Sequence, residues 1–112
     1  MKRGEVRWAS LSAPSGSEPG FRRPVVIIQA DEFNRSNINT VVCAGITSNL
    51  IRGDSPGNVR LSTRSSGLGK PSVANVSQLV TIDKRFISEK VKTLNQQSMN
   101  RINEGLRLVL NL

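Results

Sequence analysis

The sequence predicts one domain of the α+β class, spanning residues 1–112: a small antiparallel β-barrel with short helices and a C-terminal helix. Three observations lead to this fold class. A length of 112 residues suffices for one compact domain but not for two. Residues 22–30 and 40–47 are apolar on both faces, which is typical of central strands. Residues 95–110 are the one segment with clear helical periodicity.

The first half of the chain divides into short elements separated by turn-forming residues. Residues 5–11 alternate between apolar and polar side chains, so they predict a strand. Residues 12–20 are rich in Ser, Pro and Gly and predict a loop. After the strand at 22–30, residues 31–39 have room for one helical turn, with Asp31 near its N-cap. The second buried strand follows directly.

The second half begins with a turn at 53–58, which leads into a short strand at 59–61. Residues 64–70 are rich in Gly and Ser, which predicts a mobile loop without regular structure. Residues 72–82 predict a long strand. Four apolar residues are expected on one side of it: Ala74, Val76, Val80 and Ile82.

The C-terminal segment predicts the clearest element. Asp83 is placed to cap a short helix that runs to Ser88, and residues 91–94 predict a last short strand. Asn95 then opens the one long helix. Its apolar residues recur at helical spacing: Met99, Ile102, Leu106, Val109 and Leu110. Gly105 within this helix costs about 1 kcal/mol relative to alanine, so packing must hold the helix together.

The charge of the chain indicates the class of its partner. Sixteen Lys and Arg against eight Asp and Glu give a net charge of +8, and eleven of the cations are arginines. Arginine presents a planar fork that matches phosphate and carboxylate groups. The excess therefore indicates a nucleic acid or an acidic protein partner, with a generally cationic surface as the alternative.

Composition also excludes several classes of protein. The chain has no histidine and one cysteine, which excludes a Ser-His-Asp triad, most metal sites and an internal disulfide. The longest apolar run, residues 25–28, is far too short to cross a bilayer, and the N-terminus has no signal-peptide pattern. We therefore expect a cytoplasmic protein that has no association with a membrane.

Three weaker patterns have ordinary structural explanations. Cys43 lies within a buried strand and is expected to be an inert, packed thiol. Residues 67–70 (GLGK) suggest a phosphate loop, but they lack the Walker spacing and Pro71 follows them. The eight carboxylates are dispersed along the chain. We therefore expect no two-metal nuclease site, no bound metal and no cofactor.

The geometry of the two central strands brings two polar residues together. If these strands pair as consecutive antiparallel strands with the connection centred on Arg35, Arg23 lies directly opposite Thr47. The next facing pairs, Val25 with Gly45 and Ile27 with Cys43, are apolar or small. Arg23 and Thr47 would then stand at the top of an apolar column. A surface arginine beside a strand-capping threonine explains the same pattern without a site.

A series of short motifs runs in order over nearly the whole chain. They are Arg3-Gly4-Glu5-Val6, Gly16-Ser17-Glu18 with Gly20, Arg23-Pro24-Val25-Val26-Ile27-Ile28, Asn34, Ile46-Thr47-Ser48, Gln78 and Thr81-Ile82-Asp83-Lys84. With these motifs the sequence resembles the MazF/PemK family of toxin endoribonucleases, the toxin halves of type II toxin–antitoxin modules. The segment around Trp8 and Pro14 is less typical of that family.

The resemblance implies an SH3-like barrel of the CcdB/MazF type that works as a homodimer. It implies metal-independent, sequence-specific cleavage of single-stranded RNA such as mRNA, which inhibits translation and growth, and restraint by an acidic, MazE-like antitoxin. The family's catalytic arginine and threonine fall on Arg23 and Thr47. Further candidates for catalysis or RNA binding are Glu18 as the general base, Ser48, Gln78, Gly16, Ser17 and Arg22.

Two other functions remain open from the sequence. One is a non-enzymatic toxin of the related CcdB type, which shares the barrel and poisons DNA gyrase. The other is an SH3-like module that binds RNA without cutting it. The presence of both Arg23 and Thr47 favours the nuclease.

Overall fold

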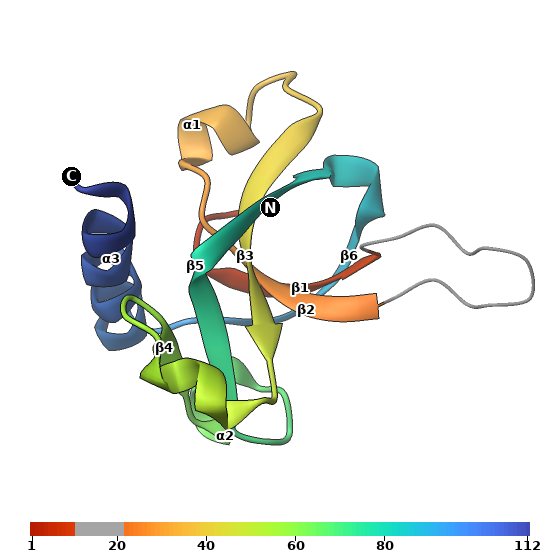
Figure 1. The fold of residues 1–112 in the computed structure, drawn as a ribbon. Helices are drawn as coiled ribbons and strands as arrows, with labels where there is room; N and C mark the ends of the chain where they lie inside the picture. Colours follow the sequence, from red (N-terminus) through yellow and green to blue (C-terminus); the bar gives the residue numbers. More distant parts are fainter. Residues whose placement is uncertain (11–21) are drawn as a thin grey trace, which may run out of the picture.

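A computed structural model describes residues 1–10 and 22–112 of the chain. Six strands form one antiparallel sheet in the order β4-β5-β3-β2-β1-β6 (Figure 1). The strands are β1 (Glu5–Ser10), β2 (Arg22–Ile27), β3 (Thr40–Thr47), β4 (Val59–Leu61), β5 (Ser72–Asp83) and β6 (Ile87–Thr93). The helices are α1 (Asp31–Asn34), η1 (Leu50–Asp54), α2 (Thr63–Ser66), η2 (Lys84–Phe86) and α3 (Gln96–Leu110). The expected fold class is confirmed.

The sheet is strongly curled. The register shifts in the β1–β6 pair and again in the β3–β5 pair, and such irregularities bend a strand and increase its twist. The curl brings β6 toward the segment that follows β4 at the opposite edge. There Lys92 of β6 donates a hydrogen bond to the carbonyl of Arg64, and Gly67 packs against Val91. The result is a half-barrel whose two edges approach each other across α2.

The main core lies inside the curl and is covered by α3. Met99, Ile102 and Leu106 of α3 are buried there, and the strands supply the remainder of the cluster. The members from outside α3 are Val6, Val26, Ile28, Ala44, Ile46, Val59, Leu61, Ala74, Val76 and Leu94. A second buried cluster lies on the opposite face of the central strands. It consists of Ala9, Val25, Ile27, Val41, Cys43 and Ile82.

Helix α3 begins and ends as its sequence predicts. The Asn95 side chain accepts a hydrogen bond from the Ser98 N–H at 2.9 Å, and Asn111 ends the helix in the left-handed conformation. Gly105 has a packing role that propensity did not reveal. A Cβ at this position would lie 2.2 Å from the carbonyl oxygen of Gly57, so only glycine lets the helix approach this turn.

Residues 64–70 differ from expectation because they are partly helical. Ser62 caps α2 by accepting a hydrogen bond from the Ser65 N–H at 3.1 Å. Ser66 is fully buried, and its hydroxyl accepts a hydrogen bond from the Leu68 N–H at 3.2 Å. The prediction of a loop over this whole segment was therefore wrong. Serines favour turns in isolation, but here they serve as a cap and as a buried anchor.

The long strand β5 does not keep one apolar side. Ala74 faces Ile46 while Leu79 faces Ala44, so β5 has three more residues than β3 between these two pairs. This irregularity changes which side chains point inward. Leu79 packs against the main core, and Val80, predicted on the apolar side, is 38% exposed.

The segment after β5 also divides differently. Asp83 caps η2 as expected, accepting a hydrogen bond from the Arg85 N–H at 3.0 Å, but η2 ends at Phe86. The last strand, predicted over 91–94, begins at Ile87 instead. The sequence pattern did not predict the first part of β6, because an edge strand needs few apolar side chains and the residues there are mostly polar and exposed. No helix in the described part of the chain is long and apolar enough to span a membrane.

Candidate active site

The pairing of β2 with β3 has the predicted register. Val25 faces Gly45, Val26 faces Ala44 and Ile27 faces Cys43. Arg23 and Thr47 lie at the neighbouring ends of these strands, and both side chains line one cavity of about 280 Å³. The two residues that the register argument placed together therefore share a cavity.

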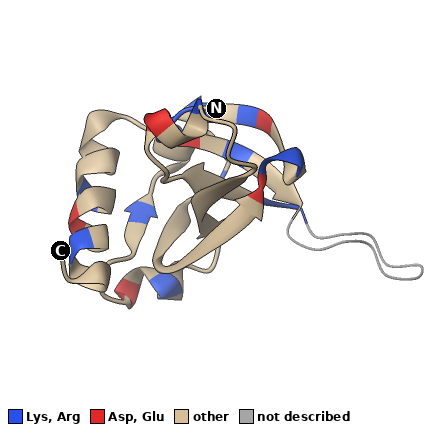
Figure 2. Ribbon diagram, turned by 90° about the horizontal axis from the view of Figure 1, so that it is seen from above, with Lys and Arg blue, Asp and Glu red and all other residues tan. Residues whose placement is uncertain are grey.

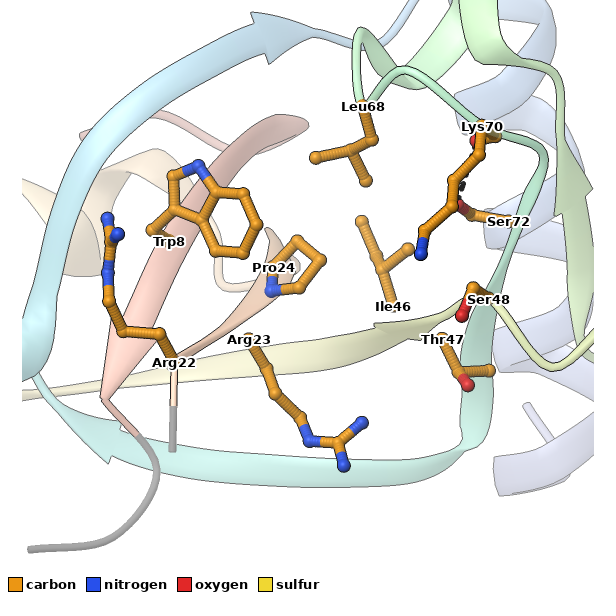
Figure 3. A pocket seen from close by; sticks show the side chains of 10 residues that line it. All are labelled: Trp8, Arg22, Arg23, Pro24, Ile46, Thr47, Ser48, Leu68, Lys70 and Ser72. Atoms are coloured by element: carbon orange, nitrogen blue, oxygen red, sulfur yellow. Dashed lines mark hydrogen bonds between the residues drawn. The ribbon is translucent and has the colours of Figure 1, made fainter. Parts of the chain in front are cut away.

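The cavity is built by three parts of the chain (Figure 3). β1 and β2 contribute Trp8, Arg22, Arg23 and Pro24; β3 and the residue after it contribute Ile46, Thr47 and Ser48; the segment from α2 into β5 contributes Leu68, Lys70 and Ser72. Three of these residues are cations, and no Asp or Glu of the described residues lines the cavity. This charge distribution favours an anionic ligand.

The hydroxyl of Thr47 is held at the cavity by the turn that follows β3. Its Oγ1 accepts a hydrogen bond from the Asn49 N–H at 3.1 Å. Asn49 in turn caps η1, since its side chain accepts a hydrogen bond from the Ile51 N–H. Because Oγ1 is engaged as an acceptor, its own proton can be donated to an anion. Ser48, beside Thr47, is exposed and also lines the cavity.

The two neighbouring arginines have different surroundings. The Arg22 guanidinium lies over the Trp8 ring, 5.0 Å from its centroid, and forms an ion pair with Glu89 of β6 at 2.8 Å. Arg23 is exposed, and Figure 3 shows its side chain pointing away from Trp8. Successive residues of a strand alternate in direction, which explains the difference. Arg22 therefore supports the indole, while Arg23 extends along the other side of the strand.

Cys43 is structural, as the sequence predicts. Its side chain is fully buried, and burial raises the pKa of the thiol to about 12. The thiolate is the nucleophilic form, so this cysteine is inert at neutral pH. Within residues 1–10 and 22–112, no three metal-binding side chains of the His, Cys, Asp or Glu type gather in one place.

The remaining sequence candidates are not part of the described cavity. Gln78 is exposed on β5, where its Oε1 accepts a hydrogen bond from the Asn75 amide at 3.0 Å, and it does not line the cavity. Gly16, Ser17, Glu18 and the loop expected at 12–20 lie outside the described residues.

Six residues that line the cavity were not among the sequence candidates: Trp8, Pro24, Ile46, Leu68, Lys70 and Ser72. Trp8 was named only within a segment that is less typical of the family, and residues 67–70 only as a rejected phosphate loop and part of a loop. A signal was nevertheless present. A lone lysine in a Gly-rich segment before a long strand, and the only tryptophan of the chain, are unusual enough to examine together.

Comparisons with known proteins identify the family to which the chain belongs. Residues 2–110 match the family model described as "PemK-like, MazF-like toxin of type II toxin-antitoxin system". Endoribonuclease MazF6 of Mycobacterium tuberculosis is 42% identical, with 100% of this chain and 98% of the relative covered. Endoribonuclease EndoA of Bacillus subtilis is 36% identical, with 100% and 96% covered.

Solved structures share the fold. A mycobacterial endoribonuclease in complex with its cognate antitoxin superimposes with a TM-score of 0.80 at 22% identity, covering 100% of this chain and 96% of that one. The Mycobacterium tuberculosis toxin MazF-mt6 gives a TM-score of 0.76 at 21% identity, covering 96% and 97%. At these identities the likeness extends to the curled sheet and its C-terminal helix.

Proposed function

Because the chain belongs to the family of PemK-like, MazF-like toxins of type II toxin–antitoxin systems, we propose that it is an endoribonuclease that cuts single-stranded RNA with Arg23 and Thr47. The observation that carries this proposal is the shared cavity of these two side chains, beside Lys70 and without a lining carboxylate among the described residues. Two relatives with the name endoribonuclease, 42% and 36% identical over the full chain, support it.

RNA brings its own nucleophile to this reaction, the 2′-OH beside the scissile phosphate. The protein has to align that hydroxyl with the phosphorus and to neutralise the charge that develops on the phosphate oxygens. The Arg23 guanidinium donates paired hydrogen bonds to the non-bridging oxygens. The Thr47 hydroxyl, whose oxygen already accepts from Asn49, donates to the phosphate. The products are a 2′,3′-cyclic phosphate and a free 5′-OH.

The reaction also needs a general base that accepts the proton of the 2′-OH. An arginine is a poor base because its pKa is far above neutral. Glu18 in the Gly16-Ser17-Glu18 motif is our candidate, from its place in the family motif. With Ser48 we propose a further contact to the RNA, since it lines the same cavity. Gln78 lies farther along β5, whose first residue Ser72 lines the cavity, and a role for Gln78 requires an RNA that extends beyond the cavity along this strand.

The nuclease is proposed to need no metal ion. The chain has no histidine, and the acidic side chains of the described residues are dispersed over the fold (Figure 2). The test is incubation of the purified protein with a long single-stranded RNA in the presence and absence of a chelator. Equal cutting under both conditions, with no cutting of DNA of the same sequence, is expected because DNA lacks the 2′-OH. Cutting that requires added magnesium contradicts this mechanism, and absence of cutting favours a gyrase-poisoning toxin or a non-catalytic RNA-binding module.

We further propose a homodimer that acts in the cytoplasm, where its mRNA substrate is translated. Val80 lies directly across from Cys43 of the second cluster and is 38% exposed, so this apolar face of the sheet continues to the surface. A second copy of the chain would cover it. Light scattering at micromolar concentration checks this, and the mass of a single chain would contradict it.

The partner that restrains the toxin is proposed to be an acidic antitoxin. The net charge of +8 attracts an acidic segment at long range. Carboxylates on such a segment would pair with the cations at the cavity and displace RNA phosphates by the same kind of hydrogen bond. A titration of an acidic antitoxin peptide against labelled RNA should therefore show competition that weakens at higher salt. Simultaneous binding of both would exclude a shared site.

A further inference from the structure

The cavity has an apolar half that phosphate chemistry does not use. Arg23, Thr47 and Ser48 lie toward one side, whereas Trp8, Pro24, Ile46 and Leu68 form an apolar wall (Figure 3). A site that held only a phosphate would need donors and no such wall. Clefts that bind a ligand ring combine a mostly apolar lining with a few placed polar groups, and this cavity has that composition.

The apolar wall is fixed before any ligand enters. Trp8 faces Pro24 across the β1–β2 pair, and Arg22 covers the indole at 5.0 Å. Arg22 is held in turn by its ion pair with Glu89 at 2.8 Å. Arg22 thus covers one face of the indole and positions it before the ligand arrives, which lowers the entropic cost of binding on the other face.

The opposite side of the cavity is anchored as well. Leu68 packs against the main core, and its N–H donates to the fully buried Ser66 hydroxyl at 3.2 Å. Ser72 is buried, and its hydroxyl donates a hydrogen bond to the Lys70 carbonyl at 3.1 Å. These bonds fix the backbone on both sides of Lys70. The Lys70 side chain is exposed, and Figure 3 shows its ammonium directed over the cavity beside Ile46.

A lysine ammonium donates hydrogen bonds and accepts none. At the edge of an apolar slot it favours a ring that presents a carbonyl oxygen and disfavours a ring that presents an amino group there. Among the pyrimidines, uracil has a carbonyl at position 4 and cytosine has an amino group at the same place. RNA-binding proteins commonly take up unpaired bases by stacking them against aromatic side chains and by hydrogen bonding to their edges.

We propose that the apolar half of the cavity binds one unpaired base of the RNA next to the scissile phosphate, and that Lys70 selects uracil over cytosine at that position. Trp8 and Leu68 enclose the ring, and the Lys70 ammonium donates to its O4. This inference rests on the proposed function, because it takes RNA to be the substrate. It adds the residues that determine which sequence is cut.

The test uses the only tryptophan of the chain as its reporter. Hexanucleotides of deoxyuridine or of deoxycytidine, which cannot be cut, are titrated against the full chain while Trp8 fluorescence is recorded. Wild type should bind the uracil oligonucleotide on the order of tenfold more tightly, as one hydrogen bond to a charged donor provides. Lys70→Met should lose most of that preference. Lys2→Met, which removes an exposed lysine that does not line the cavity, should retain it.

A second variant separates stacking from selection. Leu68→Ala should weaken the binding of both oligonucleotides several-fold and leave the ratio of their affinities unchanged, because it removes apolar lining and no hydrogen-bond donor. In parallel, the ends produced from a random RNA pool are sequenced for wild type and Lys70→Met, and uracil should become less frequent at a single position beside the cut.

The outcomes distinguish the two proposals. If the protein prefers uracil through Lys70 but cuts no RNA, the base site is supported and the nuclease proposal is contradicted. If wild type and Lys70→Met cut RNA at the same sequences and give the same Trp8 fluorescence response to the oligonucleotides, the base site is contradicted. The nuclease proposal is not affected by that result. Equal binding of uracil and cytosine by wild type also overturns the base site.

Discussion

Polar residues of the family motifs lie at both ends of the β2–β3 pair, but their roles differ between the two ends. At the end beside α1, the chain satisfies its own polar groups. Arg3 donates to the Ile28 carbonyl and to Asn103 of α3, both at 2.7 Å. Asn34 donates to the Gln29 carbonyl at 2.9 Å. At the other end, Arg23 and Thr47 line an open cavity with Lys70.

The comparison separates residues that maintain the fold from residues placed for a ligand. Asn34 belongs to the motifs that carry the resemblance, yet its side chain and its carbonyl are bound within the chain, the carbonyl by Lys84 at 3.2 Å. Its side chain closes the turn after β2 and does not line the cavity. A motif residue therefore indicates a binding site only when its side chain lines a cavity that a ligand can enter.

The largest effect is expected at the cavity end. Arg23→Ala and Thr47→Ala should each reduce the rate of RNA cleavage by about a hundredfold or more, as removal of one transition-state donor does. Their unfolding midpoints should stay close to wild type, because both residues lie at strand ends outside the buried clusters. Rates are measured on a fluorescent RNA and stability by urea unfolding.

Two matched variants sharpen this experiment. Arg35→Ala removes the same charge at the α1 end and should cut at close to the wild-type rate. Thr47→Ser keeps the hydroxyl and should recover most of the activity. If Arg35→Ala lost as much activity as Arg23→Ala, net charge and not placement would be the cause.

The next effect is expected at the α1 end and on stability. Arg3→Ala removes two side-chain hydrogen bonds that join the N-terminal segment to Ile28, the residue after β2, and to α3. It should lower the free energy of unfolding by about 2 kcal/mol. The fraction that remains folded should cleave RNA at the wild-type rate. A loss of rate without a loss of stability would remove the distinction between the two ends.

The smallest effect is expected on the stability of the protein at acidic pH. The backbone N–H of Arg3 donates to the Asp31 carboxylate at 2.7 Å, and the Asn34 amide donates to it as well, so the pKa of Asp31 is lowered. A lowered folded pKa stabilises the protein above the unfolded pKa, and this contribution is lost as the pH falls below about 4. Asp31→Asn should be less stable than wild type at pH 7, with a difference that shrinks toward pH 3.

The measurement for this prediction is thermal unfolding across that pH range. Glu32→Gln, which removes the adjacent carboxylate, serves as the comparison for the loss of one negative charge in α1. A difference between Asp31→Asn and wild type that is constant with pH would mean that the carboxylate charge does not contribute.

The sequence predicted what depends on local pattern and register. The β2–β3 pairing followed from counting residues about one turn, and the position of α3 followed from its periodicity and its asparagine cap. The low helix propensity of Gly105 does not explain why glycine occupies this position. The contact with Gly57 that requires this glycine joins segments far apart in the chain, and no local pattern reports it.

The wall of the cavity was beyond sequence reasoning for the same reason. Trp8, Leu68 and Lys70 come together only because the register shift between Ala44 and Ile46 bends the sheet and the segment after α2 returns across its end. Alternation along one strand predicts which way its side chains point. It does not predict which distant segment they will meet.

The position of β1 between β2 and β6 has a consequence for synthesis of the protein. Arg7 of β1 donates a hydrogen bond to the Ser88 carbonyl at 2.9 Å, across 81 positions of the chain. β1 can pair with β2 early in synthesis, but its pairing with β6 must wait for the last of the described strands, and such distant pairings form slowly. Glu89, which holds Arg22 over Trp8, is made late as well. A nascent toxin thus completes this cavity only when most of its own message has been translated.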